Sequence, residues 1–211
     1  QREAYNLHKI SPSQTLAIAQ KLYLEGLISY PRTSSQKIPP SVEPKKILKS
    51  LERYFPVALE ANRSKPIEGK KSDPAHPSIY PTGNKQILEG YDEKIYNLIV
   101  KRFLSLFCDD AIIDNKKITA LVDDLKFSTR GSSIKKKAWM EIYPIKMQEK
   151  EIPGINGKVK IIDSRTEEKE TQPPKRYSPA SILSELEKRN LGTKATRANI
   201  LETLYDRGYV K

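Results

Sequence analysis

The sequence predicts an α+β protein with more than one domain, in which mainly helical, winged-helix-like domains are joined by a β-rich segment. Apolar residues recur at helical spacing within residues 1–110 and again within residues 178–207. Between these regions, residues 117–143 have the composition and turn signals of strands. Residues 169–175 are polar, contain paired prolines and are predicted to form a linker. We therefore expect three parts, residues 1–110, 111–170 and 171–211.

The composition excludes several classes of protein. The chain has 211 residues, of which 30% are charged, and no run of about 18 apolar residues that could span a membrane. Residues 1–7 lack the layout of a signal peptide. Cys108 is the single cysteine, which excludes an internal disulfide and a zinc site built from cysteines. We therefore expect no membrane association and a cytoplasmic protein.

The charge favours a polyanionic partner. The formal net charge is +12 and the sequence pI is about 9.6, so nucleic acid is a better candidate than a membrane surface. The excess is uneven, because residues 1–50 carry +5 whereas residues 51–100 carry 0. Residues 101–150 and 151–211 carry +4 and +3. The basic regions therefore flank a neutral middle.

Capping residues and apolar spacing locate the helices. Ser11, Pro12 and Gln14 form an N-terminal capping signature for a helix over residues 12–25, and Gly26 is a natural stop. Apolar spacing predicts further helices over residues 42–55, 93–106, 178–189 and 194–207. Strands are expected over residues 117–125, 126–133, 137–143 and 159–163, with a turn at Gly131-Ser132 and a further strand starting at Tyr209-Val210.

Tyr30 and Arg32 form the first candidate site. They lie two residues apart in a segment that reads as extended, so both side chains are expected on one face. A positioned tyrosine can attack phosphorus if nearby cations favour the phenolate, and Arg32 can hold a phosphodiester oxygen. Pro31 stiffens the pair. The alternative is an edge-strand tyrosine beside a solvated arginine.

Two further segments could contact phosphate. His76 stands in a loop that Pro74, Pro77 and Pro81 stiffen, where it could contact a phosphate or relay a proton, or simply bond to backbone. Residues 177–210 read as helix, glycine turn, helix and strand, a winged helix-turn-helix pattern or a two-helix packing motif. The second of these helices begins with residues suited to phosphate, Thr193, Lys194, Thr196 and Arg197. No metal ligands are expected in the chain.

These three segments, in this order, resemble those of type IA DNA topoisomerases. Residues 26–33 are similar to the family's active-site segment, in which a Tyr and an Arg two residues later sit beside Thr, Asp and Ser; here Ser34 replaces the Asp. Ala75-His76 and Pro81-Thr82 match the family's histidine loop, although many relatives carry Glu and Arg where Pro77 and Tyr80 stand. Residues 183–210 resemble the last core segment in its archaeal form, although relatives often carry Tyr at Arg197.

The resemblance implies a reaction. Tyr30 would cleave one DNA strand through a transient 5′-phosphotyrosyl link, and Arg32 would stabilise the charge on phosphorus. His76, Thr196 and Arg207 would position phosphates. Passage of a strand and religation would then relax negatively supercoiled DNA without ATP.

The resemblance also implies an organisation. Residues 1–110 would be a movable, CAP-like helical domain that carries the nucleophile, residues 111–170 a β-rich hinge arch, and residues 171–211 a winged-helix-like cradle for single-stranded DNA. The family's toprim domain, which binds Mg²⁺, would precede this chain, so we expect a central fragment that is inactive alone. The expected partner is single-stranded or underwound DNA, and the expected state is a nucleoid-associated monomer.

Two alternatives stay open. The chain could be the topoisomerase module of a reverse gyrase, which would require a helicase-like module upstream. It could also be a non-catalytic winged-helix module that reads base edges and prefers duplex DNA.

Overall fold

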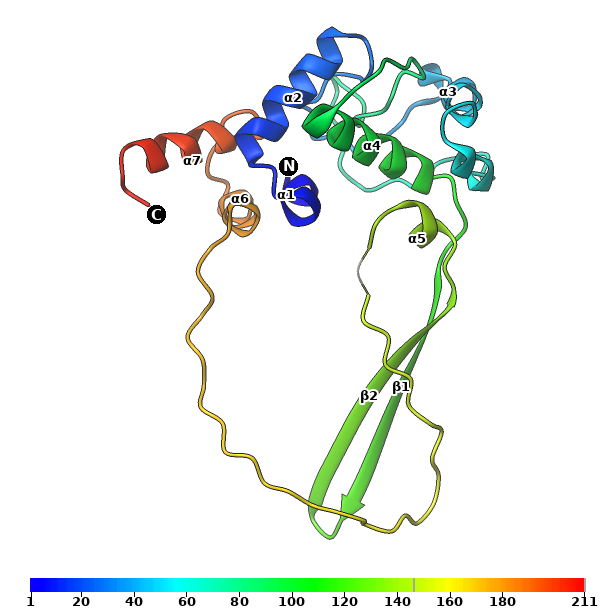
Figure 1. Cartoon of the computed structure of the whole chain (residues 1–211), viewed down its shortest axis with the longest axis vertical. Coiled ribbons are helices and arrows are strands. Elements are labelled where there is room, and N and C mark those ends of the chain that lie inside the picture. The colour runs from blue at the N-terminus through cyan, green and yellow to red at the C-terminus, as the bar shows by residue number, and fades with distance from the viewer. Residues whose placement is uncertain (146, 211) are drawn as a thin grey trace. The chain divides into compact units, whose positions relative to one another are not determined.

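A computed structural model describes residues 1–145 and 147–210 of the chain and confirms the α+β composition. The elements, in chain order, are α1 (Arg2–His8), α2 (Pro12–Leu24), η1 (Pro40–Val42), α3 (Pro44–Glu52), η2 (Pro56–Glu60), α4 (Gly90–Ser105), β1 (Ile112–Val122), β2 (Leu125–Lys136), α5 (Trp139–Ile142), α6 (Pro179–Lys188) and α7 (Arg197–Asp206), where η marks a 3₁₀-helix (Figure 1).

The chain divides into two compact units. The helical unit comprises residues Gln1–Asp110 and Ala138–Pro144 together with the C-terminal residues from Tyr177 onward. The β unit comprises Ala111–Lys137 and Ile145–Arg176. Helices α6 and α7 thus pack with the N-terminal helices, although more than 60 residues of mostly β-unit sequence separate them from Asp110 in the chain.

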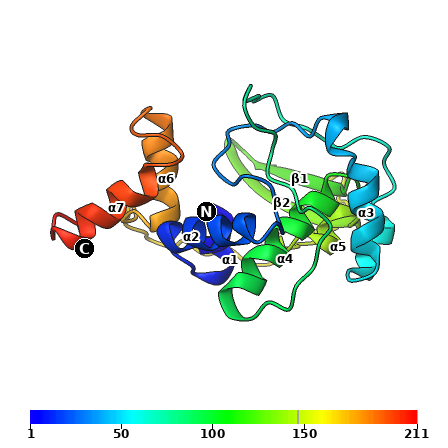
Figure 2. The same ribbon diagram turned by 90° about the horizontal axis from the view of Figure 1, so that it is seen from above.

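The core of the helical unit is built on α2 and α4, which pack against each other (Figure 2). Leu22 of α2 and Val100 and Leu104 of α4 are fully buried, and the rings of Phe103 and Phe107 lie 5.2 Å apart. These positions follow the helical spacing of apolar residues in the sequence. Burial of each such side chain contributes about 1.5–3 kcal/mol to stability.

The predicted start and stop of α2 are confirmed. The helix begins at Pro12, and Ser11 Oγ accepts a hydrogen bond from the Gln14 backbone N–H at 3.2 Å. Gly26, just beyond the helix, has φ +70°, a conformation that glycine adopts without strain. The predicted helix over residues 42–55 is shorter, because Pro44 disfavours a helical conformation at the residue before it and Glu43 adopts φ 54°.

The β unit contains an antiparallel hairpin of β1 and β2. Its turn is Asp123-Asp124, where Asp123 has φ 49°, so the predicted turn at Gly131-Ser132 was wrong. Gly131 lies within β2 opposite Lys116. A Cβ atom at Gly131 would lie 2.4 Å from the Lys150 carbonyl oxygen, so the glycine permits close approach of the next segment.

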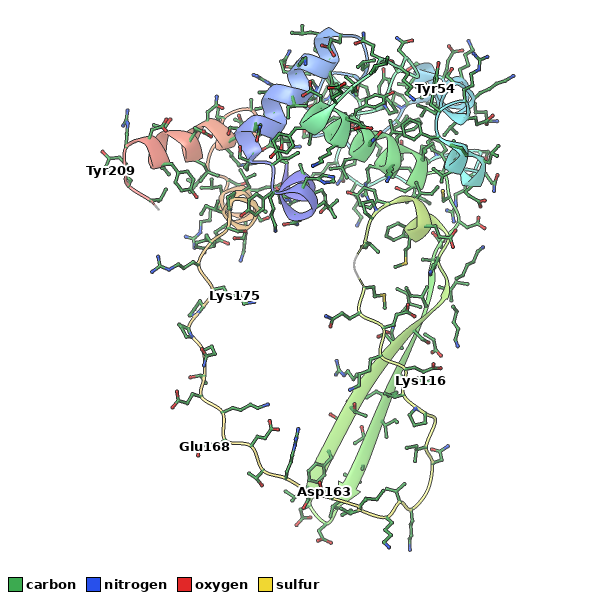
Figure 3. All side chains as sticks on the ribbon, viewed as in Figure 1. Tyr54, Lys116, Asp163, Glu168, Lys175 and Tyr209 are labelled. Atoms are coloured by element: carbon green, nitrogen blue, oxygen red, sulfur yellow. The ribbon has the colours of Figure 1, made fainter. Side chains whose placement is uncertain are left out.

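Two other predicted strands were also wrong. Residues 137–143 contain the short helix α5 instead, and Ile142 and Tyr143 are buried in the helical unit, where α5 packs against α4. Residues 159–163 form no strand, and Ile162 is 95% exposed, so no packing favours one there. Residues 151–178 have neither helix nor strand, as expected for the linker within them; Asp163, Glu168 and Lys175 mark this segment (Figure 3).

The C-terminal helix pair was predicted more accurately. Ser178 caps α6 through a reciprocal capping box with Ser181, and Leu183 is buried where α6 contacts α1. Helix α7 begins at Arg197 rather than at Lys194. The expected strand at residues 209–210 is absent, and Lys211 lies outside the described residues. Among the helices that the structure describes, none is long and apolar enough to span a bilayer.

Cys108 gives a test of the core. Its side chain is buried, and burial, followed by the nearby charge of Glu60, raises the pKa of the thiol to about 11. Only the thiolate reacts with disulfide reagents, so labelling at pH 8 should be at least about 100-fold slower in the native chain than in urea. The measurement is the rate of labelling followed by absorbance; equal rates in both conditions would contradict this packing.

Candidate active site

Two extended segments, residues 27–35 and 73–82, run side by side in the helical unit. Ile28 and Pro81 form an isolated antiparallel bridge. The Ser29 backbone N–H donates to the Tyr80 carbonyl oxygen at 2.9 Å, and the Tyr80 N–H donates to Ser29 Oγ at 2.9 Å. Thr82 Oγ1 donates to the Gly26 carbonyl oxygen at 2.7 Å. Residues 27–35 are not part of a sheet. The loop of residues 73–82 therefore supplies the hydrogen-bond partners of their backbone.

The pairing continues beyond Arg32 through side chains. Thr33 Oγ1 donates to the His76 carbonyl oxygen at 3.2 Å. Asp73 Oδ2 accepts from Ser34 Oγ at 3.3 Å and from the Ser34 N–H at 3.5 Å. Asp73 Oδ1 accepts from the N–H groups of Ala75 at 3.0 Å and His76 at 3.3 Å. These hydrogen bonds, that from Ala75 first, hold the pKa of Asp73 below its ordinary value.

The structure brings Tyr30 and His76 together. Their rings are tilted by 43° with centroids 4.5 Å apart, and the ring of Tyr23 meets Tyr30 edge-on at 5.4 Å. Both Tyr30 and His76 are half-buried. The tyrosine is thus held between two rings, one from α2 and one from the proline-stiffened loop.

A groove of about 480 Å³ has Arg32, Ser34 and Asp73 of the two extended segments in its wall. The other cations that line it are Lys71, Lys194 and Arg197, and its acidic groups are Asp73 and Glu187. Four positive and two negative side chains give the lining a net positive charge. Such a surface attracts phosphate groups.

Residues at the start of α7 form one wall of the groove. Lys194 Nζ donates to the Thr33 carbonyl oxygen at 3.3 Å, and partial burial, followed by the charge of Lys71, lowers the pKa of Lys194. The Thr193 N–H donates to Thr196 Oγ1 at 2.8 Å. Arg197 donates to the carbonyl oxygens of the preceding turn, at Leu191 and Gly192. The helix start predicted from the sequence is therefore next to the Tyr30–Arg32 segment.

Arg207 lies elsewhere. It is the C-cap of α7, at the opposite end of that helix from Thr196. The structure therefore does not bring Arg207 to the same end of α7 as the other predicted phosphate contacts, and its role stays a prediction.

Three charged residues of the site were not predicted as site residues. Glu187 pairs with Lys71 at 3.0 Å and with Arg2 at 3.9 Å, and Asp73 joins the two extended segments. Lys71 and Glu187 are 116 residues apart in sequence, so no local pattern could have paired them. The hydrogen bond from Lys71 lowers the pKa of Glu187.

A family model described as DNA topoisomerase matches residues 1–211 of this chain. The chain belongs to the type IA DNA topoisomerase family. DNA topoisomerase 1 of Methanothermobacter thermautotrophicus is 47% identical over 219 residues, which cover 100% of this chain and 30% of that protein. DNA topoisomerase 1 of Pyrococcus horikoshii is 44% identical, with coverage of 100% and 33%.

A solved structure supports the same assignment. Full-length topoisomerase I from Thermotoga maritima superposes with a TM-score of 0.74 at 25% identity, covering 100% of this chain and 37% of that one. This topoisomerase chain thus spans about one third of the length of the curated relatives named above.

The described residues of the groove do not fit a metal site. Among the described residues, no group of three His, Cys, Asp or Glu side chains is arranged to hold a metal ion. The two acidic groups of the groove are already engaged, Asp73 with backbone N–H groups and Ser34, and Glu187 with Lys71. The described residues of the groove therefore leave no free carboxylate to hold Mg²⁺.

The Lys71–Glu187 pair can be tested by a double-mutant cycle. The side chains are 60% and 35% exposed, so solvent screens the pair and a coupling of about 0.5 kcal/mol is expected at pH 7 for Lys71→Gln with Glu187→Gln. Because the folded-state pKa of Glu187 is lowered, this contribution is present above the ordinary glutamate pKa and is lost as the pH falls through the lowered value.

Urea unfolding at pH 7 and at progressively lower pH measures that coupling. Glu185→Gln is the matched control, since Glu185 lies on the same helix but pairs with Arg189. Coupling of Lys71 to Glu185, or coupling to Glu187 that persists in strong acid, would contradict the pairing.

Proposed function

We propose that this chain is the nucleophile-bearing part of a DNA topoisomerase that cleaves and reseals one DNA strand. The single observation that supports this most strongly is that the Tyr30 ring packs against His76 while Arg32, two residues further along the chain, lines a groove of net positive charge. A tyrosine close in the chain to an arginine that lines a positively charged groove is suited to attack a phosphodiester held there.

The proposed step is a transesterification. Tyr30 Oη forms a bond to phosphorus, the bond from phosphorus to the 3′-oxygen breaks, and the phenolic proton is balanced by protonation of the leaving 3′-oxygen. The 5′-phosphotyrosyl ester keeps the bond energy, so the reverse attack by the 3′-hydroxyl reseals the strand without ATP. Arg32 would stabilise the negative charge that develops on the phosphoryl oxygens.

Other residues would hold the DNA backbone. His76 would contact the scissile phosphate, a role that the contact of its ring with that of Tyr30 supports. Thr193, Lys194, Thr196 and Arg197 would bind adjacent phosphates from the start of α7, and Arg207 a more distant one. As the family resemblance implies, we propose a single-stranded or underwound substrate whose backbone these groups would bind.

The three parts expected from the sequence, residues 1–110, 111–170 and 171–211, would have different roles. Residues 1–110 would carry Tyr30 and move away with the cleaved end, residues 111–170 would form the hinge arch, and residues 171–211 would form a winged-helix-like cradle for the strand. Mg²⁺ would be bound by a toprim domain from outside these residues and would serve mainly religation. We further propose a nucleoid-associated, cytoplasmic monomer.

A chimera tests the reaction. The 211 residues would replace the matching third of the Pyrococcus horikoshii relative. The chimera should relax negatively supercoiled plasmid without ATP and form a covalent protein–DNA adduct, and Tyr30→Phe should abolish both while leaving the fold intact. The 211 residues alone should relax nothing. An adduct in the Tyr30→Phe chimera would mean another nucleophile, and relaxation by the isolated chain would contradict the proposed division of labour.

The preference for unpaired DNA is a separate test. The chain should bind an unpaired oligonucleotide more tightly than its duplex, with affinity falling as salt rises. Lys194→Gln should reduce the salt slope by about 0.7, whereas Lys45→Gln, on the exposed side of α3, should leave it unchanged. Fluorescence anisotropy across a salt series measures both. Duplex preference would favour the non-catalytic winged-helix alternative.

A further inference from the structure

We propose that Asp73 is a positioning residue of this active site, whose carboxylate couples the His76 loop to the Tyr30–Arg32 segment. The inference rests on the proposed function and adds a residue that the family resemblance did not point to. Asp73 stands near the start of the proline-stiffened loop, three residues before His76 and 41 residues beyond Arg32.

The two carboxylate oxygens of Asp73 accept hydrogen bonds from different segments. Oδ1 accepts hydrogen bonds from the N–H groups of Ala75 and His76, so it shapes the backbone of the loop at the histidine itself. Oδ2 accepts from both the hydroxyl and the N–H of Ser34, so it fixes the end of the segment that carries the nucleophile. The Asp73 side chain therefore holds both extended segments of the site in place.

This network needs two acceptor oxygens. All four partners of Asp73 are donors, and an ionised carboxylate is the side chain that presents acceptors on both sides. An asparagine of the same size has one acceptor oxygen and one donor NH₂ group. Asp73→Asn therefore keeps the volume but leaves either the N–H groups of the loop or the Ser34 N–H without an acceptor, although the Ser34 hydroxyl can turn to accept from the NH₂ group.

The position opposite Asp73 strengthens the inference. Ser34 Oγ lies 3.3 Å from Asp73 Oδ2, so an aspartate at position 34 would set two carboxylates against each other. The serine hydroxyl instead donates to Asp73, so one negative charge serves both segments.

Asp73 would act through geometry. Its carboxylate cannot bind a phosphate, yet it lines the groove and sets the backbone of His76, whose ring lies 4.5 Å from that of Tyr30. Displacing these rings by a fraction of an ångström moves the phenol out of line with phosphorus, which slows cleavage more than it weakens DNA binding. Loss of the negative charge should leave the affinity equal or slightly greater.

The test uses the chimera described above in single turnover. The substrate is an unpaired oligonucleotide labelled at its 3′ end, because a 5′-phosphotyrosyl link retains that side of the break. The rate of covalent adduct formation and the Kd for the oligonucleotide are measured separately. The variants are Asp73→Asn, Ser34→Asp and their combination, with Asp92→Asn as control, since Asp92 pairs with Lys21 on α2.

Asp73→Asn should slow adduct formation by about 10- to 100-fold while Kd changes by less than about 3-fold. Ser34→Asp should be similarly impaired by repulsion. The combined variant should recover to within about 3-fold of the unsubstituted chimera, because the amide oxygen introduced by Asp73→Asn can serve the loop while its NH₂ group donates to the carboxylate introduced by Ser34→Asp.

Several outcomes would overturn the proposal. One is that Asp73→Asn forms the covalent adduct as fast as the Asp92→Asn control. Another is that Asp73→Asn weakens the Kd for the oligonucleotide but does not slow adduct formation. The third is that the combined variant forms the adduct no faster than Ser34→Asp alone. Failure of the proposed function is distinguishable, since the unsubstituted chimera would then form no adduct, or Tyr30→Phe would still form one.

Discussion

The candidate active site depends on the hydrogen bonding between two extended segments that belong to no sheet. Pro31 removes one backbone donor from the segment that carries Tyr30, so that segment cannot be held by a regular strand ladder. The loop of residues 73–82 replaces the ladder with a mixture of backbone, hydroxyl and carboxylate partners. Its prolines keep these acceptors in place without a neighbouring strand, and the position of His76 against Tyr30 follows.

Packing against the helical core makes that arrangement rigid. The active-site segment leaves α2 through Gly26, and Leu27 and Ile28 are buried beneath it in the same cluster as Leu22 and Val100. Tyr23, from the end of the same helix, provides the second ring against Tyr30. Tyr30 therefore follows closely in the chain after two residues that are anchored in the core.

Local signals in the sequence were reliable where one residue type decides the conformation. The caps at Ser11 and Ser178 begin helices as predicted, because a side-chain oxygen satisfies backbone donors within one turn. The predicted turn at Gly131 was wrong. The glycine lies within β2, where the absence of a side chain allows the Lys150 backbone to come close. The predicted strand over residues 137–143 was wrong, since Trp139–Ile142 form the short helix α5, which packs on α4.

The sequence alone determined the helix caps, the basic flanks and the motif residues Tyr30, Arg32 and His76, since each depends on composition or near neighbours. Tertiary structure decided what surrounds them. Contacts such as Lys194 with Thr33, or Lys71 with Glu187, join residues more than 100 positions apart, and the charge of a groove depends on which side chains meet there. Such contacts cannot be predicted from periodic patterns in the sequence, because they form only when the helices pack.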